Sequence, residues 1–205
     1  MRQPWRPPER AREEILDAAE RHLVRGGPDA VRVQVVAREI GISDAAVHYH
    51  FGSREGLLEA LLRRAGRRLR EQITDALEPP ALDVRALSEH LHNTYSARGY
   101  ARLTAWLRLT GWQPSGGGML RTQAEAMHRR RASVASVARA GSPELEDTLF
   151  SLALLNLFFW AEPLVGHAAL EMVGLPGDAP TAERLRSWFV QLVEDHVTRG
   201  DPPRP

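Results

Sequence analysis

VRVQVVAREIGISDAAVHYHFGSREGLL, residues 31–58, contains two short helical patterns joined by a tight turn. Apolar residues recur at three- and four-residue steps over about 32–40, and a shorter helical pattern follows from Ser43. Gly41 stands in the turn, where the backbone needs a positive φ or a close approach. Ser43 and Ser53 are each placed to cap the helix that follows. The stretch therefore predicts three helices in quick succession.

Two helices joined in this way form a helix-turn-helix when three requirements are met. The crossing point needs a small residue, the turn needs a residue that tolerates unusual φ, and apolar residues must lie beneath the second helix. Ala37, Gly41, and Ile42 with Val47 meet these requirements at the expected spacing. An ordinary corner between two helices of a helical enzyme is the alternative for this pattern taken alone.

Helical patterns continue on both sides. Residues 1–8 are rich in Pro and Arg and are expected to form a flexible arm, and a helix is expected from Glu9 to the stop at Gly26. The helix that begins at Ser53 continues for about 20 residues, until two prolines end it. Gly and Pro breaks in the remainder predict helices over about 83–97, 99–111, 118–140, 143–161 and 181–198. Residues 162–173 are either a separate short helix or a kinked continuation.

The predicted fold class is all-α, because no part of the chain shows the alternation typical of strands. We expect an arm (1–8), a three-helix N-terminal helix-turn-helix head (9–52), and a long helix that leads from it into a C-terminal helical body (53–200).

Charge and composition exclude several classes of protein. The net charge of +1 divides into +4 for residues 1–70 (14 Arg against 10 Asp or Glu) and −3 for the rest, so a polyanion is expected to meet the N-terminal part. The chain has no cysteine, which excludes disulfides and thiolate-held metal. The N-terminus lacks an apolar signal region, and the longest apolar stretch is too short to span a membrane. We expect a cytoplasmic protein.

The motifs in residues 15–58 resemble the N-terminal domain of the tetracycline-repressor-like (TetR/AcrR) family of bacterial transcriptional regulators. The resemblance lies in ILDAAERHLVRGG, then VVAREIGIS, then AAVHYHFGSREGLL, and it is most specific from Tyr49 to Leu58. It implies a homodimer that binds an inverted-repeat operator in double-stranded DNA and responds to a small molecule bound in the helical body.

The resemblance also implies roles for individual residues at the DNA. Residues 43–49 would form the recognition helix in the major groove, with Tyr49 and His50 against phosphates or sugars and Arg54, where the family usually has Lys, on a phosphate. Arg32 and Gln34 would touch the DNA backbone or base edges. Asp44 departs from the basic residue that is common there, so base discrimination would depend on Asp44, Ala45 and His48, beside the helix cap Ser43. The arm, with Arg2 and Arg6 beside Trp5, either enters a minor groove or is a disordered terminus.

In the body, the helix at 143–161 is apolar all the way round from Leu149 to Trp160. A helix without a polar face is buried on every side, either by a partner subunit or as a central helix of the monomer. We expect a four-helix dimer interface, which the resemblance also implies, and assign to it Leu149, Leu152, Leu185, Trp188, Phe189, Leu192 and His196.

Polar or aromatic residues set among apolar ones are the candidates for an effector pocket: His90, Asn93, Tyr95, Trp106, Met127, His128, Asn156 and Phe159. Trp106 and Met127 can equally be core residues, and Asn156, a polar group in an apolar helix, needs a ligand, a water or a neighbour. The apolar lining favours a hydrophobic or aromatic effector.

No other chemistry is predicted. His48 with His50, and His90 with His92, are two residues apart and so lie on different sides of a helix, which excludes a shared metal ion. The chain shows no phosphate-binding loop, nucleophile elbow or zinc-protease motif, and neither an enzyme nor a cofactor is expected. The expected function is a repressor released by its effector. The alternative is a non-catalytic ligand-binding or architectural protein that binds DNA weakly and without sequence preference.

Overall fold

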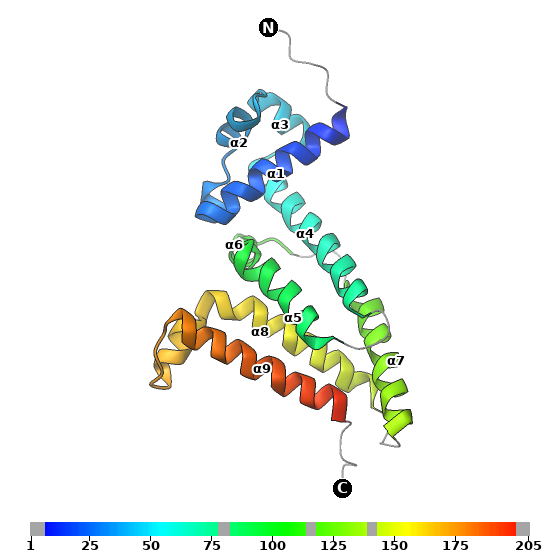
Figure 1. Cartoon of the computed structure of the whole chain (residues 1–205). Coiled ribbons are helices and arrows are strands. Elements are labelled where there is room, and N and C mark those ends of the chain that lie inside the picture. The colour runs from blue at the N-terminus through cyan, green and yellow to red at the C-terminus, as the bar shows by residue number, and fades with distance from the viewer. Residues whose placement is uncertain (1–6, 78–82, 114–117, 139–142, 200–205) are drawn as a thin grey trace. The chain divides into compact units, whose positions relative to one another are not determined.

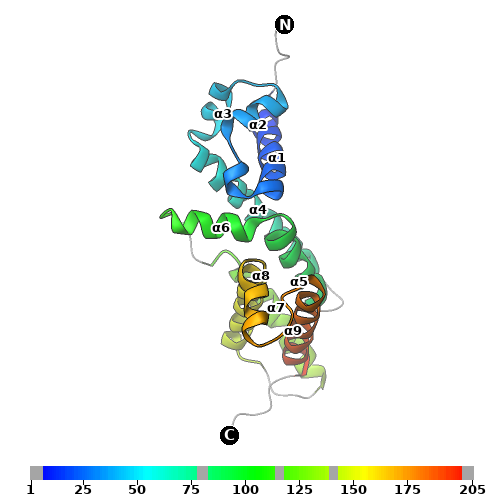
Figure 2. The same ribbon diagram turned by 90° about the vertical axis from the view of Figure 1, so that its left-hand side faces the viewer.

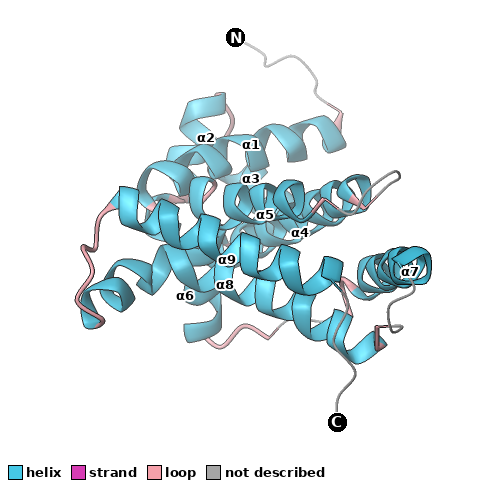
Figure 3. Cartoon of the chain, turned by 60° about the horizontal axis from the view of Figure 1, so that its bottom comes forward, coloured by secondary structure: helices cyan, strands magenta, loops and turns pink. Residues whose placement is uncertain are grey.

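The computed structural model describes residues 7–77, 83–113, 118–138 and 143–199, and all regular secondary structure in these ranges is helical (Figure 3). This confirms the predicted all-α fold. The α-helices are α1 (Pro8–Gly26), α2 (Val33–Ile40), α3 (Asp44–Phe51), α4 (Arg54–Ala76), α5 (Val84–His92), α6 (Tyr100–Leu109), α7 (Arg121–Ala138), α8 (Leu145–Met172) and α9 (Ala179–Arg199). A 3₁₀ turn (Pro28–Ala30) follows α1, and a π-helical turn (Asn93–Ala97) follows α5.

By packing, the chain divides into two compact units. The first unit contains the described residues up to Arg67 together with Ala97–Gln113, so α6 belongs with α1–α3. The second unit contains Arg68–Ser96 and the described residues from 118 onward. The functional boundaries predicted at residues 8, 52 and 200 stay a prediction.

In the first unit, α1 buries one face because apolar residues recur along it at helical spacing. That face packs against α2 and the 3₁₀ turn, and α2 in turn packs against α3 (Figures 1 and 2). The buried apolar residues of α1 and α2 are Ile15, Leu16, Ala18, Ala19, Leu23, Val33, Val36 and Ala37. From α3 the unit buries Val47, so the opposite face of that helix is left outward.

The ends of the short helices are set by the residues predicted for them. Gly41 ends α2 in the left-handed conformation, at φ 68°. The Ser43 hydroxyl accepts a hydrogen bond from the Ala46 N–H at 3.2 Å, and the Ser53 hydroxyl accepts one from the Gly56 N–H at 3.0 Å. Both predicted caps are therefore confirmed.

In the second unit, α8 packs against α5, α7 and α9 around an apolar core (Figure 1). Three contacts between α8 and α9 show that they run antiparallel: His196 bonds Asp147, Phe189 stacks on Phe158 with ring centroids 3.9 Å apart, and Arg186 bonds Glu162. This register places the Leu154–Leu157 part of α8 beside the Trp188–Leu192 part of α9.

Helix α8 continues without interruption through Pro163. Residues 162–172 are therefore a continuation of the preceding helix rather than a separate one. With 28 residues, α8 is long and apolar enough to cross a membrane by length and composition, which the apolar stretch identified in the sequence had not suggested. Of its buried residues, Leu152, Leu155 and Phe159 belong to the apolar core of the second unit.

Candidate nucleic-acid interface

The outward face of α3 carries most of the residues predicted to bind DNA. Val47 is buried and fixes the rotation of the helix. Seven of the nine predicted residues are exposed, on α3, its cap or the start of α2: Arg32, Gln34, Ser43, Asp44, Ala45, His48 and Tyr49. Tyr49 is the most prominent, with 83% of its surface exposed. His50 and Arg54 are only partly exposed.

The C-terminal end of α3 is held by a tight turn and by α1. The Ser53 N–H donates to the Phe51 carbonyl at 2.8 Å across Gly52, whose φ of 74° and ψ of −60° describe a γ-turn. Few residues other than glycine adopt this conformation. Arg12 donates from Nη1 to the His50 carbonyl at 2.8 Å and lies over the Phe51 ring. No sequence pattern had indicated that Arg12 would hold α3 in place.

The same turn brings the Gly52 carbonyl back to His48, whose Nδ1 lies 2.9 Å from it. A carbonyl oxygen only accepts hydrogen bonds, so Nδ1 carries the hydrogen. In the neutral imidazole the other nitrogen, Nε2, is then an acceptor. His50 has a different environment, with its ring edge-on to Tyr49 at 5.3 Å between centroids.

Arg54, at the start of α4, uses its guanidinium within the first unit. Its Nε donates to the Val31 carbonyl at 2.8 Å and its Nη2 to the Pro28 carbonyl at 2.6 Å. The group also lies over the Trp106 ring, 4.9 Å from its centroid. These contacts tie α4 to the loop before α2 and to α6. The predicted phosphate contact of Arg54 stays a prediction, and this geometry favours a structural role.

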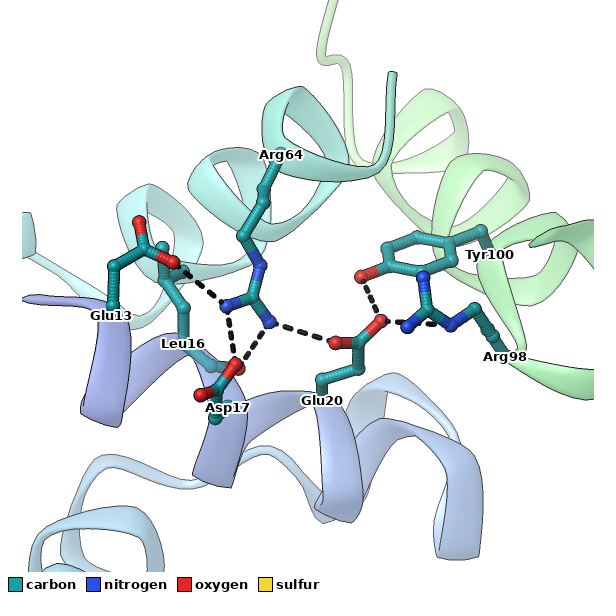
Figure 4. A network of polar contacts seen from close by, with 7 residues as sticks. All are labelled: Glu13, Leu16, Asp17, Glu20, Arg64, Arg98 and Tyr100. Carbon is teal, nitrogen blue, oxygen red and sulfur yellow. Dashed lines mark hydrogen bonds and ion pairs between the residues drawn. The ribbon is translucent and has the colours of Figure 1, made fainter. Parts of the chain in front are cut away.

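A buried charge network holds α4 against α1 (Figure 4). The Arg64 side chain is 3% exposed and donates to Glu13, Asp17 and Glu20 at 3.2, 2.6 and 2.8 Å, and also to the Leu16 carbonyl at 3.0 Å. Burial lowers the pKa of Arg64, but the hydrogen bond to Asp17 and the charge of Glu20 outweigh burial and raise it. Arg64 therefore stays charged and ties α4 to α1.

The network continues into α6. The Tyr100 hydroxyl donates to Glu20 at 2.8 Å, and Arg98 lies 3.6 Å from the same carboxylate (Figure 4). Burial, together with the negative charge of Glu20, raises the pKa of Tyr100, so its hydroxyl stays a donor. Helix α6 is thereby fixed to α1 within the first unit.

Comparison with known proteins assigns the segment that contains α2 and α3 to a known domain family. Residues 15–61 match the family model described as bacterial regulatory proteins, tetR family. Residues 15–61 therefore form a domain of the tetR family. The resemblance seen in the sequence is confirmed.

Curated relatives match about half of the chain. The HTH-type transcriptional regulator BetI of Rhizobium meliloti is 34% identical over 98 residues, which is 47% of this chain and 48% of that protein. An uncharacterized HTH-type transcriptional regulator of Mycobacterium tuberculosis is 33% identical over 115 residues, which is 54% of this chain and 55% of that protein. The chain therefore spans about half the length of the curated relatives it matches.

A solved structure extends the likeness in fold. A TetR variant of Acinetobacter baumannii AYE, in complex with minocycline, has a TM-score of 0.59 over 87% of this chain and 91% of that one. At 16% identity, this comparison shows a shared fold and no more.

The predicted pocket residues have different surroundings among the described residues, and their contact with an effector stays a prediction. Trp106 belongs to the first unit, where it lies over Arg54. In the second unit, Asn156 accepts a hydrogen bond from the Tyr95 hydroxyl at 2.8 Å, which supplies the neighbour that Asn156 needs. Burial raises the pKa of Tyr95 to about 12. Met127 is core, His128 lies 3.3 Å from the Thr148 hydroxyl, His90 is half-buried and Asn93 is exposed.

A hollow of about 340 Å³ lies between α5, α8 and α9. Phe159 lines it, whereas most of its other lining residues are polar: Arg85, Ser88, Glu89, His92, Glu183, Arg186 and Ser187. The buried His92 Nδ1 has no hydrogen-bond partner among the described residues. Burial, and then the charge of Arg186, lowers the pKa of His92. Within the part of the chain that is described, no three His, Asp or Glu side chains gather into a metal site.

The predicted dimer residues divide between the core and the surface. Leu152 and Phe189 are buried in the core of the second unit, so they are not available to a partner, and that assignment is corrected. Trp188, Leu192 and His196 are exposed, and Leu149 and Leu185 are half-buried. The same surface includes Phe150, Leu154 and Leu157, which the sequence analysis did not single out. Periodicity could not have distinguished them, because α8 is apolar on all sides.

Proposed function

We propose that the chain is a ligand-responsive, sequence-specific DNA-binding transcriptional regulator that acts in the cytoplasm as a repressor. The observation that carries the proposal is the tetR-family domain, in which α3 is capped, held from behind and exposed along its outer face. A helix placed in this way fits the major groove. The naming of the matched relatives as transcriptional regulators supports it.

On DNA, α3 enters the major groove and the start of α2 lies against the backbone. Tyr49 and Arg32 are exposed and provide the phosphate contacts, while Asp44, Ala45 and His48 face the bases. Gln34 is exposed in the first turn of α2 and contacts the backbone or a base edge. Ser43 caps α3, and His50 supports Tyr49 through their ring contact.

The regulator functions as a homodimer. The exposed apolar residues of α8 and α9 lie side by side in the antiparallel register, and they include Phe150, Leu154, Leu157, Trp188 and Leu192. Large exposed apolar patches on soluble proteins mark interaction surfaces. A second copy covers this surface, which places two recognition helices on an inverted repeat with half-sites about 34 Å apart.

The hollow between α5, α8 and α9 is the effector site in this proposal. Arg85 pairs with Glu194 at 3.1 Å and Arg186 with Glu162 at 2.8 Å, so both of its cations are neutralised. Glu89 and Glu183 have no ion pair with any described residue. The hollow therefore carries the unpaired negative charges of Glu89 and Glu183. This favours a small organic cation as effector over the hydrophobic one expected from the sequence.

A footprint on DNA from the chain's own promoter region tests the proposal. The wild-type chain protects an inverted repeat, and Tyr49→Ala weakens protection about tenfold while the chain remains dimeric, because a phosphate contact is lost. His167→Ala, a change in the second unit, is the matched control and protects as wild type does. Equal, sequence-independent binding by all three proteins would favour the architectural alternative.

The effector part is tested by titrating the protein–DNA complex with small alkylamines and, in parallel, with carboxylates of the same size. Amines alone release the DNA, and Glu89→Gln with Glu183→Gln removes their effect without changing DNA affinity. If carboxylates alone released the DNA, the negative charge assigned to the hollow would be contradicted.

A further inference from the structure

The outward face of α3 presents an unusual set of polar groups for a helix that contacts a polyanion. Residues 44–51 contain no Arg or Lys. Asp44 and His48 are four residues apart and both exposed, so they lie next to each other on one face of the helix. An ionised aspartate only accepts hydrogen bonds.

His48 is also an acceptor at this surface, because the γ-turn at Gly52 fixes its ring. The Gly52 carbonyl takes the Nδ1 hydrogen at 2.9 Å, so Nε2 of the neutral ring carries a lone pair. The turn is defined by the bond from the Ser53 N–H to the Phe51 carbonyl and by the positive φ of Gly52. Backbone geometry, rather than another side chain, therefore decides which nitrogen of His48 faces away.

In the major groove, hydrogen-bond donors come only from exocyclic amino groups. Cytosine offers N4–H and adenine offers N6–H, whereas guanine and thymine present acceptors at the corresponding positions. Two protein acceptors in a row are matched by amino groups and repelled by the oxygens of guanine and thymine. Side chains four residues apart on a helix are roughly 6 Å apart, which spans about two base steps.

We propose that Asp44 and His48 select an operator half-site by accepting hydrogen bonds from cytosine or adenine amino groups about two base steps apart. The proposal rests on the proposed function, since it requires α3 to lie in the major groove. Asp44 and His48 are specificity-determining residues, and much of their selectivity is rejection of guanine and thymine. Most of the affinity comes from other residues.

The test begins with selection of operators from a random DNA pool by the full-length wild-type chain. Every base pair carries one such amino group, so the expected result concerns the strand: cytosine or adenine on the same strand at two positions of each half-site, about two base steps apart. His48→Ala loses base preference at one of them, and Asp44→Asn, which gains a donor, changes preference at the other. His167→Ala is the control, because His167 also bonds a glycine carbonyl, that of Gly177 at 2.6 Å, but lies in the second unit. It selects the wild-type sequence.

A second measurement uses base analogues in the selected operator. Removing only the amino group at the His48 position weakens wild-type binding about tenfold and leaves His48→Ala unaffected. Replacing the purine N7 by carbon at that position changes the affinity of neither wild type nor His48→Ala. Amino groups on opposite strands at the two selected positions, or sensitivity to N7 without sensitivity to the amino group, would overturn the inference while leaving the proposed function standing. Selection of no sequence at all would instead defeat the proposed function.

Discussion

Arg54 is 26% exposed at its side chain, and its strongest donors are already used by the Pro28 and Val31 carbonyls. A phosphate could be reached only by giving up bonds that hold the start of α4 to the loop before α2. The exposed Arg32 side chain makes no such hydrogen bonds with the described residues. The two arginines are therefore expected to contribute in different ways, Arg54 to the stability of the first unit and Arg32 to DNA affinity.

This difference predicts opposite results for two alanine variants. Arg32→Ala lowers the slope of log affinity against log salt by about 1, because one phosphate contact is lost. Arg54→Ala leaves that slope unchanged and destabilises the chain by about 2 kcal/mol, because two buried carbonyls lose a charged donor. Fluorescence anisotropy at several salt concentrations and thermal unfolding measure the two effects. A reduced slope in Arg54→Ala would restore it as a phosphate contact.

At this scale the sequence was informative where a residue acts on its neighbours. The caps at Ser43 and Ser53 and the left-handed Gly41 depend on bonds within a few positions, and all three were predictable. Arg54 was not, because Trp106 lies 52 positions away and the carbonyls it binds exist in any sequence. The ring nitrogen of His48 that faces outward likewise depends on a turn conformation.

Among the elements, the start of α8 is joined to both α7 and α9 through Asp147. Arg131 of α7 lies 2.6 Å from its carboxylate, and His196 of α9 lies 2.9 Å from it. Burial raises the pKa of Asp147, but the hydrogen bonds from Arg131 and His196 outweigh burial and hold it below its ordinary value. One ionised side chain thus adds a polar link among three helices that also share an apolar core.

The lowered pKa of Asp147 predicts how stability depends on pH. Because the carboxylate is stabilised in the folded state, its contribution is complete above the unfolded pKa of about 4 and is lost as pH falls through the lower folded value. Asp147→Asn should lower stability by about 3 kcal/mol at pH 7, since Arg131 is left buried without its partner. Its melting temperature should fall less steeply than that of wild type from pH 5 to pH 2.5.

Calorimetry across that range measures both effects, with Glu125→Gln as the control. Glu125 pairs with Arg121 on the exposed side of α7, so its loss should cost less than about 1 kcal/mol. If the melting temperatures of wild type and Asp147→Asn fell equally steeply as the pH is lowered, the role of this carboxylate would be contradicted.

For α8, the sequence was sufficient to predict a helix and insufficient to orient it. A helix that is apolar on every side has no periodic signal for the face that packs inward. Leu152 and Phe159 turn inward because α5 and α9 are there, and Leu154 and Leu157 are left outward. Likewise, Pro163 suggested a break, yet tertiary packing keeps the helix continuous.

For the molecule as a whole, the main feature is that large apolar side chains of α8 and α9 remain exposed to solvent in the single chain. Trp188 is 62% exposed and Leu157 is 55% exposed. We expect Trp188→Glu with Leu157→Glu to sediment at the mass of one chain, 22.9 kDa, at micromolar concentration while helix content stays unchanged. The charges oppose burial of the surface in a dimer but not folding.

Leu109→Glu is the matched control, because Leu109 is 89% exposed and belongs to the first unit. It should sediment as wild type does, at twice the mass of one chain. If wild type also sedimented as a single chain, the homodimer would be disproved and operator binding would have to be explained by one head.

The packing of α6 with the N-terminal helices has a practical meaning for anyone who builds hybrid regulators. A cut after α4 would transplant α1–α4 and leave behind Trp106, which lies on Arg54, and Tyr100, which bonds Glu20. In the transplanted piece Glu20 would keep Arg64 but lose the Tyr100 hydroxyl, and the Arg54 guanidinium would lose the ring that covers it. In this molecule the portable DNA-binding module is discontinuous, so exchanging it requires two grafted segments, residues up to 67 and residues 97–113, rather than one.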